Sequence, residues 1–304
     1  MDNDRVAVFG SGGQLGTELT AEFARRGYRV SGFARGHIEN ADGGRVDITD
    51  AAQVEECLAR VDPAVVINAA AYNQVDVAEK EPQAAYLVNG LAVRNLALAC
   101  RQMDARLVHF STDYVFDGLA GRACTEQDVP RPLGAYAVSK LAGEFYARAY
   151  LDNALVIRTC GVYGPGGLDT ARGNFVEMML RLAARGAPIR VVEDHVASPT
   201  FAPALASRTA DLVERGAQGL FHIGGGTPIS WFDWAVKIFA AAGLNPPLKP
   251  TTEREFRTAA RRPKYSALSN AKMESLGIAP MPSLDDAIGL YMLARSRKVP
   301  TLAP

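Results

Sequence analysis

The chain has 304 residues and a formal net charge of zero, because 33 basic side chains balance 33 acidic ones. That balance argues against an extended surface for nucleic acid or for an anionic membrane. Hydrophobic residues make up 48% of the chain, which is long enough for one large domain with a smaller partner. No apolar run approaches the length of a membrane span and no signal peptide is visible, so we expect a cytoplasmic protein.

The cysteines and histidines show no spacing typical of a metal site. The four cysteines (Cys57, Cys100, Cys124 and Cys160) are scattered, without a CxxC pair. We expect buried free thiols in a reducing compartment and no bound metal.

A glycine-rich turn follows the first apolar run, Val6 to Phe9, and a helical pattern starts at once behind it. Such a turn lets a diphosphate come close to backbone amides, and the helix N-terminus adds unpaired N–H groups and a partial positive charge. The same glycines could instead serve close packing of strand and helix. We expect a dinucleotide to bind at Gly10, Gly12, Gly13, Gln14 and Leu15.

The first half of the chain alternates apolar runs with helical patterns. Strands are predicted at 28–33, 45–46, 64–71 and 105–110, and helices at 15–26, 50–60 and 81–101. This alternation predicts an α/β fold with a doubly wound, Rossmann-like parallel sheet. In such sheets ligands bind at the carboxyl ends of the strands, where the small side chains Ala69, Ala70 and Ala71 leave room.

The end of the second strand bears on the choice of cofactor. Folds selective for NAD usually place an acidic residue there, and this chain has Arg35 instead. A guanidinium suits the 2′-phosphate of NADP, although an ordinary surface arginine is the alternative. Asp47 and Ile48 follow the third strand and could face the adenine, or Asp47 could be a loop residue before the helix cap Thr49 or Asp50. We therefore expect NADPH, with NADH as the alternative.

The second half departs from simple alternation. A helix runs to about Tyr150, strands are predicted at 154–159, 189–193 and 219–223, and a helix at 174–185. Capping patterns at Ser230 and Ser283 start the last two helices. We expect residues 1–160 and about 200–223 to form the cofactor domain, and residues 161–199 and 224–304 a smaller C-terminal α/β domain for the substrate.

Tyr136 and Lys140 stand four residues apart and therefore share one helix face. A lysine ammonium lowers the pKa of a nearby phenol because it favours the phenolate, and it can also hold cofactor ribose hydroxyls. A hydroxyl from Thr112 or Ser111 could orient a substrate carbonyl. Each feature alone has a plain alternative, an exposed helix pair or a turn residue. In this order along one sheet they indicate proton transfer.

The chain resembles the extended short-chain dehydrogenases/reductases that act on nucleotide sugars, and within them the dTDP-4-dehydrorhamnose reductase family. The matching segments run through nearly the whole chain in family order: Gly10 to Leu19, Val66 to Tyr72, Val75 to Glu79, His109 to Gly118, Tyr136 to Glu144, Ile157 to Thr159, Gly173 to Phe175, Ser198 to Thr200, and Arg262-Pro263.

The resemblance implies the reduction of a 4-keto-6-deoxysugar by NADPH, dTDP-4-dehydro-L-rhamnose giving dTDP-L-rhamnose. Tyr136 would protonate the sugar oxygen, Lys140 would assist and grip the nicotinamide ribose, and Thr112 would bind the reacting oxygen. In the same way, Val75, Asp113 and Tyr114 would line the sugar pocket, and Asn174 and Arg262 would meet the nucleotide diphosphate.

One absent residue argues against a related reaction, and one departure keeps alternatives open. Related dehydratases carry a glutamate after the aspartate that follows the threonine, whereas here Tyr114 follows Asp113, which disfavours dehydration. Rhamnose-pathway reductases commonly have a tryptophan where this chain has Gly161, so a different sugar is an alternative. A second is a non-catalytic NADP-binding regulatory subunit like that of methionine adenosyltransferase. The acidic magnesium cluster of some members cannot be placed here, and a monomer or a homodimer remains open.

Overall fold

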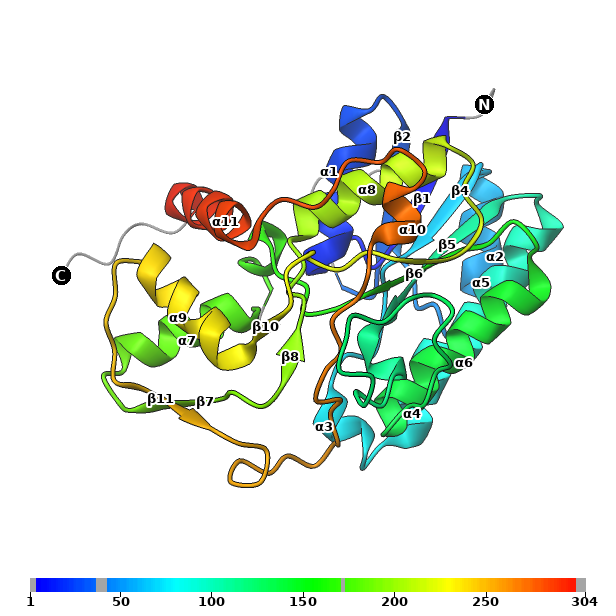
Figure 1. The fold of residues 1–304 in the computed structure, drawn as a ribbon. Coiled ribbons are helices and arrows are strands. Elements are labelled where there is room, and N and C mark those ends of the chain that lie inside the picture. Colours follow the sequence, from blue (N-terminus) through cyan, green and yellow to red (C-terminus); the bar gives the residue numbers. More distant parts are fainter. Residues whose placement is uncertain (1–3, 37–42, 171–172, 299–304) are drawn as a thin grey trace.

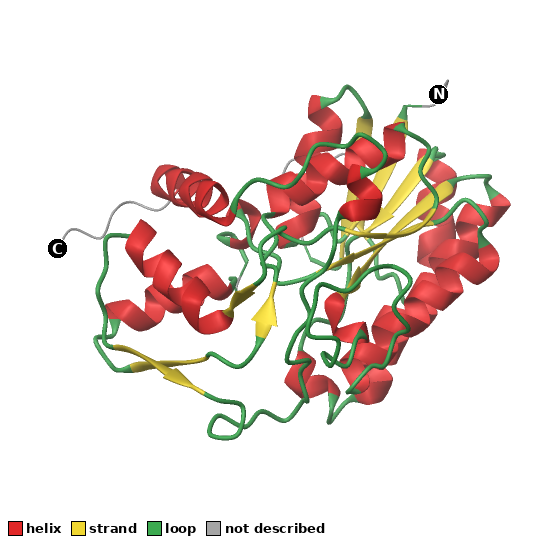
Figure 2. Ribbon diagram, viewed as in Figure 1, coloured by secondary structure: helices red, strands yellow, loops and turns green. Residues whose placement is uncertain are grey.

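The computed structural model describes residues 4–36, 43–170 and 173–298. Its larger part is a parallel sheet with helices on both faces (Figure 1). Its smaller part gathers helices and two short sheets at one side of the larger part, as the colours of Figure 2 make plain.

The central sheet has seven parallel strands in the order β3-β2-β1-β4-β5-β6-β9. Chain order reverses between β1 and β4, which opens a crevice at the carboxyl ends of these two strands. The doubly wound sheet predicted from the sequence is confirmed. The strands are β1 Arg5–Phe9, β2 Arg29–Ala34, β3 Gly43–Arg45, β4 Val65–Asn68, β5 Arg106–Thr112, β6 Leu155–Thr159 and β9 Gly219–His222.

Each face of the sheet is buried under its own helices because alternate side chains of a strand point to opposite sides. In β1, Ala7 and Phe9 pack with residues of α2, α5 and α6, whereas Val6 and Val8 pack with residues of α1 and α8 (Figure 1). These helices are α1 Gln14–Arg25, α2 Ala51–Val61, α5 Ala92–Gln102, α6 Ala135–Tyr150 and α8 Ala202–Glu214.

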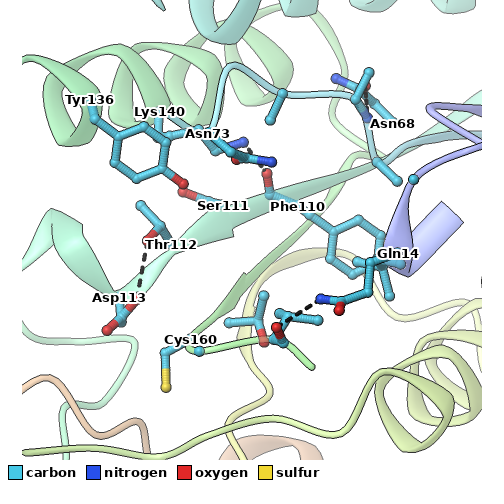
Figure 3. A pocket seen from close by; sticks show the side chains of 18 of the residues that line it. Gln14, Asn68, Asn73, Phe110, Ser111, Thr112, Asp113, Tyr136, Lys140 and Cys160 are labelled. Atoms are coloured by element: carbon cyan, nitrogen blue, oxygen red, sulfur yellow. Dashed lines mark hydrogen bonds between the residues drawn. The ribbon is translucent and has the colours of Figure 1, made fainter. Parts of the chain in front are cut away.

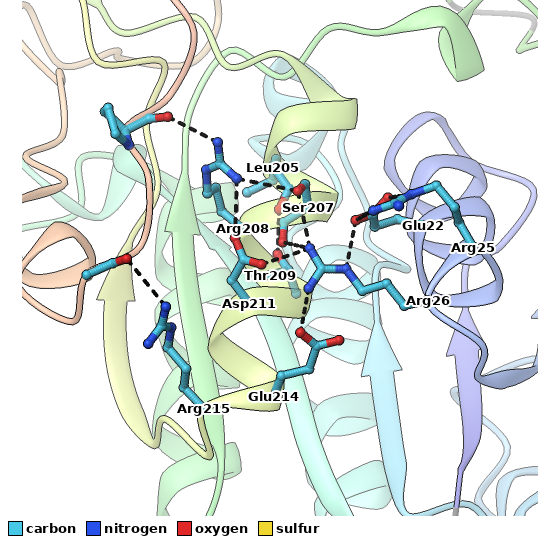
Figure 4. A network of polar contacts seen from close by, with 12 residues as sticks. Glu22, Arg25, Arg26, Leu205, Ser207, Arg208, Thr209, Asp211, Glu214 and Arg215 are labelled. Atoms are coloured by element: carbon cyan, nitrogen blue, oxygen red, sulfur yellow. Dashed lines mark hydrogen bonds and ion pairs between the residues drawn. The ribbon is translucent and has the colours of Figure 1, made fainter.

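Ion pairs and hydrogen bonds also connect the C-terminal end of α1 to α8 (Figure 4). The guanidinium of Arg26, the C-cap residue of α1, lies 2.8 Å from Glu22 on α1, and 2.8 Å from Asp211 and 2.6 Å from Glu214 on α8. Hydrogen bonds from Arg25 and Arg26 lower the pKa of Glu22 to about 2. The helix carrying the glycine turn is thereby tied to a helix more than 170 residues further along the chain.

The smaller part has its own apolar core, in which Tyr163, Trp234 and Tyr291 are fully buried. Helices α7 Phe175–Ala184, α9 Trp231–Ala241 and α11 Leu284–Lys298 surround this core. Two short sheets complete it, β7 Ile189–Val192 with β11 Leu248–Thr251, and β8 Val196–Ala197 with β10 Ile229–Ser230.

The chain passes between the two parts more often than the sequence patterns indicate. Strand β9 and helix α8 belong to the larger part, as expected. Met273 of the short helix α10 (Ala271–Glu274) also packs in the core of the larger part, as do Ile278 and Met281, which follow it in the chain. These three belong to the segment 224–304, which we expected in the smaller domain. The exact domain division stays a prediction.

The predicted helix 81–101 is present, but its middle is a π-helix. Residues Leu87–Leu91 form the π-turn between α4 (Pro82–Tyr86) and α5. Asn89 in this turn accepts a bond from the Tyr72 backbone N–H at 2.8 Å and donates to the Tyr72 carbonyl at 3.1 Å. The wider turn lets a buried amide hold the loop that follows β4, and π-turns often mark functional positions. A short helix, α3 Val75–Ala78, follows that loop.

Among the described residues, no helix is long and apolar enough to cross a membrane. All four cysteines are free and buried, in agreement with the sequence analysis.

A buried ion pair joins α6 to the sheet. The Arg158 guanidinium on β6 donates two bonds to the Glu144 carboxylate, at 2.9 and 2.7 Å, and their side chains are only 3% and 1% exposed. Ser111 on β5 donates a third bond to Glu144 at 2.5 Å. Because the pair is dry, its charges satisfy one another rather than water.

We predict that Glu144→Ala lowers the free energy of unfolding by about 3–5 kcal/mol, because Arg158 would stay buried without a counter-charge. Urea denaturation measures this loss. A chain carrying Glu144→Leu and Arg158→Met together should lose less than Glu144→Ala alone. The exposed Arg148→Ala on the same helix is the control and should change stability by no more than about 0.5 kcal/mol. A loss below about 1 kcal/mol for Glu144→Ala would contradict the role of the pair.

Candidate active site

The site is built on a close backbone approach at the glycine turn. Gly10 has φ +81°, and a Cβ there would lie 2.6 Å from the Ala70 backbone nitrogen. A Cβ on Gly16 would lie 2.0 Å from the Gly10 carbonyl oxygen. Both distances are far below van der Waals contact, so only glycine fits at either position. The turn therefore lies directly against the loop that follows β4.

The first turn of α1 offers backbone amides to an anion. Gly13 is its N-cap, and as a glycine it has no side chain that could cap the first amides. The first amides of a helix have no partner within it and carry the positive end of the helix dipole. Gln14 and Leu15 therefore present a place suited to a phosphate group.

Two adjoining cavities extend from this turn. The larger has a volume of about 460 Å³ and lies between the turn, the ends of β4, β5 and β6, and helix α6 (Figure 3). The smaller, of about 310 Å³, lies beside the ends of β2 and β3. Both are lined by Gly13, Asn73 and the three alanines 69–71, so together they form a long crevice. Its shape and glycine floor fit an extended dinucleotide.

The smaller cavity contains the residues expected at the adenosine end. Arg35 lies exposed at its rim, directly after β2, and the buried Ile48 lies in its wall. Asp47 also lines it, but its carboxylate accepts bonds from the Thr49 N–H at 2.9 Å and hydroxyl at 2.8 Å. Asp50 is the N-cap of α2, so of the two proposed caps the structure uses Asp50.

The larger cavity brings the three expected catalytic side chains together. Thr112 ends β5, while Tyr136 and Lys140 enter from α6 (Figure 3). The Tyr136 hydroxyl points from the helix toward the end of β5, where Ser111 and Thr112 lie. The Thr112 hydroxyl donates to Asp113 at 3.1 Å and accepts from the Tyr114 N–H at 3.2 Å, which fixes its orientation.

Lys140 is deeply buried, and its ammonium donates to the Phe110 carbonyl at 2.5 Å. Burial lowers the pKa of Lys140 to about 8, and the nearby Glu144 opposes this shift. His109 is wholly buried, and burial together with Lys140 holds its pKa well below the usual value. A neutral His109 adds no competing positive charge beside the ammonium. Its Nδ1 lies 3.2 Å from the Asn68 amide, which lines the same cavity.

Asp113 is a buried carboxyl group on the cavity wall. Burial raises its pKa to about 7, although bonds from Ser266 at 2.5 Å and from Thr112 favour the charged form. Tyr114 packs edge-on against Tyr136, with ring centroids 6.1 Å apart. Burial also raises the pKa of Tyr114. The ring that packs against Tyr136 therefore belongs to a phenol that stays uncharged near neutral pH.

Four of the predicted substrate residues lie outside both cavities: Tyr114, described above, and Val75, Asn174 and Arg262. Val75 starts the short helix α3 and is half-buried. The Arg262 guanidinium is paired with Asp76, at 2.7 and 3.1 Å. Asn174 caps α7 and donates to Gln14 at 2.9 Å. The structure therefore gathers the candidate catalytic residues and the candidate cofactor residues along the crevice, except Gly12, which lines neither cavity. The two polar diphosphate candidates, Arg262 and Asn174, already have hydrogen-bond partners within the protein.

Other cavity residues were not singled out from the sequence. Asn68, Asn73 and Val162 line the larger cavity without carrying a pattern of their own. Asn68 could have been identified as a candidate site residue because it is a polar side chain at the end of a buried strand, where polar residues are uncommon. Gly161 also lines the cavity. Among the described residues, no group of three or more His, Cys, Asp or Glu side chains could hold a metal ion.

Comparisons with known proteins agree with this geometry. A family model described as RmlD substrate binding domain matches residues 4–296. The chain is 36% identical to the spore coat polysaccharide biosynthesis protein SpsK of Bacillus subtilis, over 96% of this chain and 98% of that protein. It is 38% identical to dTDP-4-dehydrorhamnose reductase of Mycobacterium tuberculosis, over 96% and 93%.

A solved structure of dTDP-4-dehydrorhamnose reductase from Bacillus anthracis in complex with NADP superposes with a TM-score of 0.88 at 33% identity, over 96% of this chain and 99% of that one. The chain therefore belongs to the RmlD substrate binding domain family, which confirms the resemblance to dTDP-4-dehydrorhamnose reductases indicated by its motifs.

Proposed function

We propose that the protein is an NADPH-dependent oxidoreductase that reduces the 4-keto group of a nucleotide-activated 6-deoxysugar, converting dTDP-4-dehydro-L-rhamnose to dTDP-L-rhamnose. The observation that carries the proposal is the convergence of Thr112, Tyr136 and Lys140 on one cavity that continues into the glycine-lined crevice. The related reductases named above point to the same reaction.

Each catalytic side chain has a distinct task in this proposal. The Thr112 hydroxyl would turn its one proton from Asp113 to the ketone oxygen and so orient the ketone. Tyr136 gives its phenolic proton to that oxygen as the alcohol forms. The Lys140 ammonium stabilises the phenolate left behind and binds ribose hydroxyls of the cofactor. Bound NADPH supplies the hydride that reduces carbon 4.

The cofactor residues divide along the crevice. Gly10, Gly12, Gly13, Gln14 and Leu15 would hold the diphosphate, while Arg35, Asp47 and Ile48 would surround the adenosine. Ala69, Ala70 and Ala71 keep the crevice wide where the dinucleotide crosses from one cavity to the other. The relative with bound NADP supports NADPH over NADH, as does Arg35.

The sugar end is assigned to Val75, Asp113 and Tyr114, with Arg262 near the nucleotide. Asp113 lines the cavity already. Arg262 is 22% exposed and would turn from Asp76 toward a diphosphate. A nucleotide sugar and NADPH are water-soluble metabolites, so we place the reaction in the cytoplasm and propose a monomer or homodimer without nucleic-acid or membrane partners.

The test is the loss of NADPH absorbance with enzymatically prepared dTDP-4-dehydro-L-rhamnose, together with identification of the sugar product. Formation of dTDP-L-rhamnose is the expected result. Gly161 on the cavity wall favours a second candidate, the reduction of another nucleotide-linked 4-keto-6-deoxysugar. Oxidation with such a sugar but not with the rhamnose precursor would select it. NADPH binding without turnover of any ketosugar would support a regulatory role instead.

We predict that Tyr136→Phe lowers kcat about 10²–10⁴-fold while NADPH binding is nearly kept, because only the transferable proton is removed. Steady-state kinetics and NADPH fluorescence measure the two effects. Tyr146→Phe is a matched control on the same helix, since its hydroxyl contacts Tyr86 rather than the cavity. Normal turnover by Tyr136→Phe would remove Tyr136 as the proton donor.

We predict that Arg35→Ala raises KM for NADPH about tenfold and changes KM for NADH little, because only NADPH carries a 2′-phosphate for a guanidinium to bind. Both values come from initial rates at saturating ketosugar. Arg148→Ala, an exposed arginine on α6, controls for the general loss of positive charge. Equal changes for the two cofactors would sink the assignment.

We predict a pH-dependent stability term from Asp113. Its pKa is raised from 3.8 to about 7 in the folded protein, so the native state binds more protons than the unfolded chain between these values. The stability of the wild type relative to Asp113→Asn should therefore fall as pH rises from about 4 to about 7. Urea unfolding across this range measures the difference, with the exposed Asp104→Asn as control. A flat difference would contradict the raised pKa.

A further inference from the structure

We propose that Gln14 and Asn174 form a positioning pair that fixes the cofactor-binding turn against the smaller part of the molecule. The inference rests on the proposed function, because the pair would set how the nicotinamide meets the sugar. Asn174 then acts through Gln14 rather than by touching the nucleotide diphosphate.

Both polar atoms of the Gln14 side-chain amide form hydrogen bonds that link α1 to the segments after β6. It is the first residue of α1, and its backbone belongs to the turn suited to the diphosphate. Its Nε2 donates to the Val162 carbonyl at 2.7 Å, and its Oε1 accepts from Asn174 Nδ2 at 2.9 Å. Gln14 and Val162 both line the larger cavity, where Figure 3 draws the bond between them. One residue thus joins the phosphate end of the crevice to the loop behind β6.

Asn174 is itself held rigidly from the other side. Its Oδ1 caps α7 by accepting the Glu177 N–H at 3.1 Å, and its Nδ2 lies 3.2 Å from the Tyr291 hydroxyl. Tyr291 donates to Glu177 at 2.9 Å, and Arg295 donates to the same carboxylate at 2.7 Å. The Asn174 side-chain amide, which donates to Gln14, is therefore held by contacts with both α7 and α11.

The loop between these two amides is shaped for their contact. A Cβ on Gly167 would lie 2.1 Å from Gln14 Oε1 and 2.8 Å from Asn174 Nδ2, so any larger residue would separate them. The neighbouring Gly166 N–H donates to Glu18 of α1 at 2.9 Å, which gives the same loop a second attachment. Gln14 and Glu18, four residues apart on α1, thus both accept hydrogen bonds from the segment that follows β6.

The geometry has a kinetic consequence. A hydride donor and its acceptor carbon must approach within a narrow distance, and a misplacement of about 1 Å can cost about 10²-fold in rate. The turn would position the cofactor, while Thr170 and Gly173 of the smaller part line the same cavity. Loosening Gln14 from Asn174 should therefore reduce hydride transfer and uncouple the two binding sites, with little effect on binding of the cofactor alone.

The primary test is Asn174→Asp, compared with Gln14→Met. Aspartate keeps the helix cap but replaces the donating amide with an acceptor, so the bond to Gln14 is lost. We expect kcat with NADPH and the ketosugar to fall about 10–100-fold, and the change in NADPH Kd to stay below about threefold. The double variant should be little worse than either single one, because both remove the same link.

A second readout does not depend on turnover. Calorimetric titration of dTDP is carried out with and without saturating NADP⁺. In the wild type NADP⁺ should tighten dTDP binding, and in Asn174→Asp this coupling should disappear. Ser283→Ala is the matched control, since it removes the N-cap of α11 in the same part of the molecule. It should lower the melting temperature through the lost cap and leave kcat and the coupling intact.

The outcomes separate this inference from the proposed function. A wild-type kcat and intact coupling in Asn174→Asp, with only the melting temperature lowered, would overturn the positioning role. A dTDP affinity weakened equally with and without NADP⁺ would make Asn174 a direct nucleotide contact and would also overturn it. Failure of the wild type to reduce any dTDP-linked ketosugar would defeat the proposed function, while loss of coupling in Asn174→Asp would still support the pair.

Discussion

The ligand crevice depends on a contact between two stretches of bare backbone. At Gly10 the turn after β1 approaches the loop after β4 so closely that a single methyl group would separate them, and Gly16 brings α1 down onto the same turn. Because no side chain intervenes, the amides at the start of α1 reach the middle of the sheet edge. The two cavities meet at this point, and the loop is held from behind by Asn89.

The two buried charged side chains of helix α6, Lys140 and Glu144, have different hydrogen-bond partners. Both oxygens of Glu144 are bonded by Arg158 and Ser111, and the Lys140 ammonium donates to a neutral group, the Phe110 carbonyl. Burial without a direct carboxylate lowers the pKa of Lys140 to about 8. A shared ion pair with Glu144 would have drawn the ammonium away from the cavity. The Arg158 pair thus leaves the lysine available to the tyrosine four residues before it.

The patterns that predicted the fold are those that depend on local physics. The helix expected at 15–26 is α1 at Gln14–Arg25, and the strand expected at 154–159 is β6 at Leu155–Thr159, since periodicity and glycine stops act over a few residues. The π-turn at Asn89 could not be predicted, because its cause is a distant loop. The same holds for Asn174, whose partner Gln14 lies 160 positions away. Local patterns could place the candidate residues Thr112, Tyr136 and Lys140 around one cavity, whereas partners across the two parts could not be predicted.

Gly161 shows why one absent side chain does not define a pocket. A Cβ at this position would meet Pro199 Cα at 3.3 Å and the Trp231 indole at 3.8 Å. Trp231 comes from the first turn of α9 and packs against Phe175 with ring centroids 4.8 Å apart. An aromatic edge therefore already fills the space toward which a residue at 161 would project. Glycine at 161 in place of a tryptophan therefore does not simply enlarge the cavity. Its effect on the choice of sugar depends on the position of the Trp231 side chain.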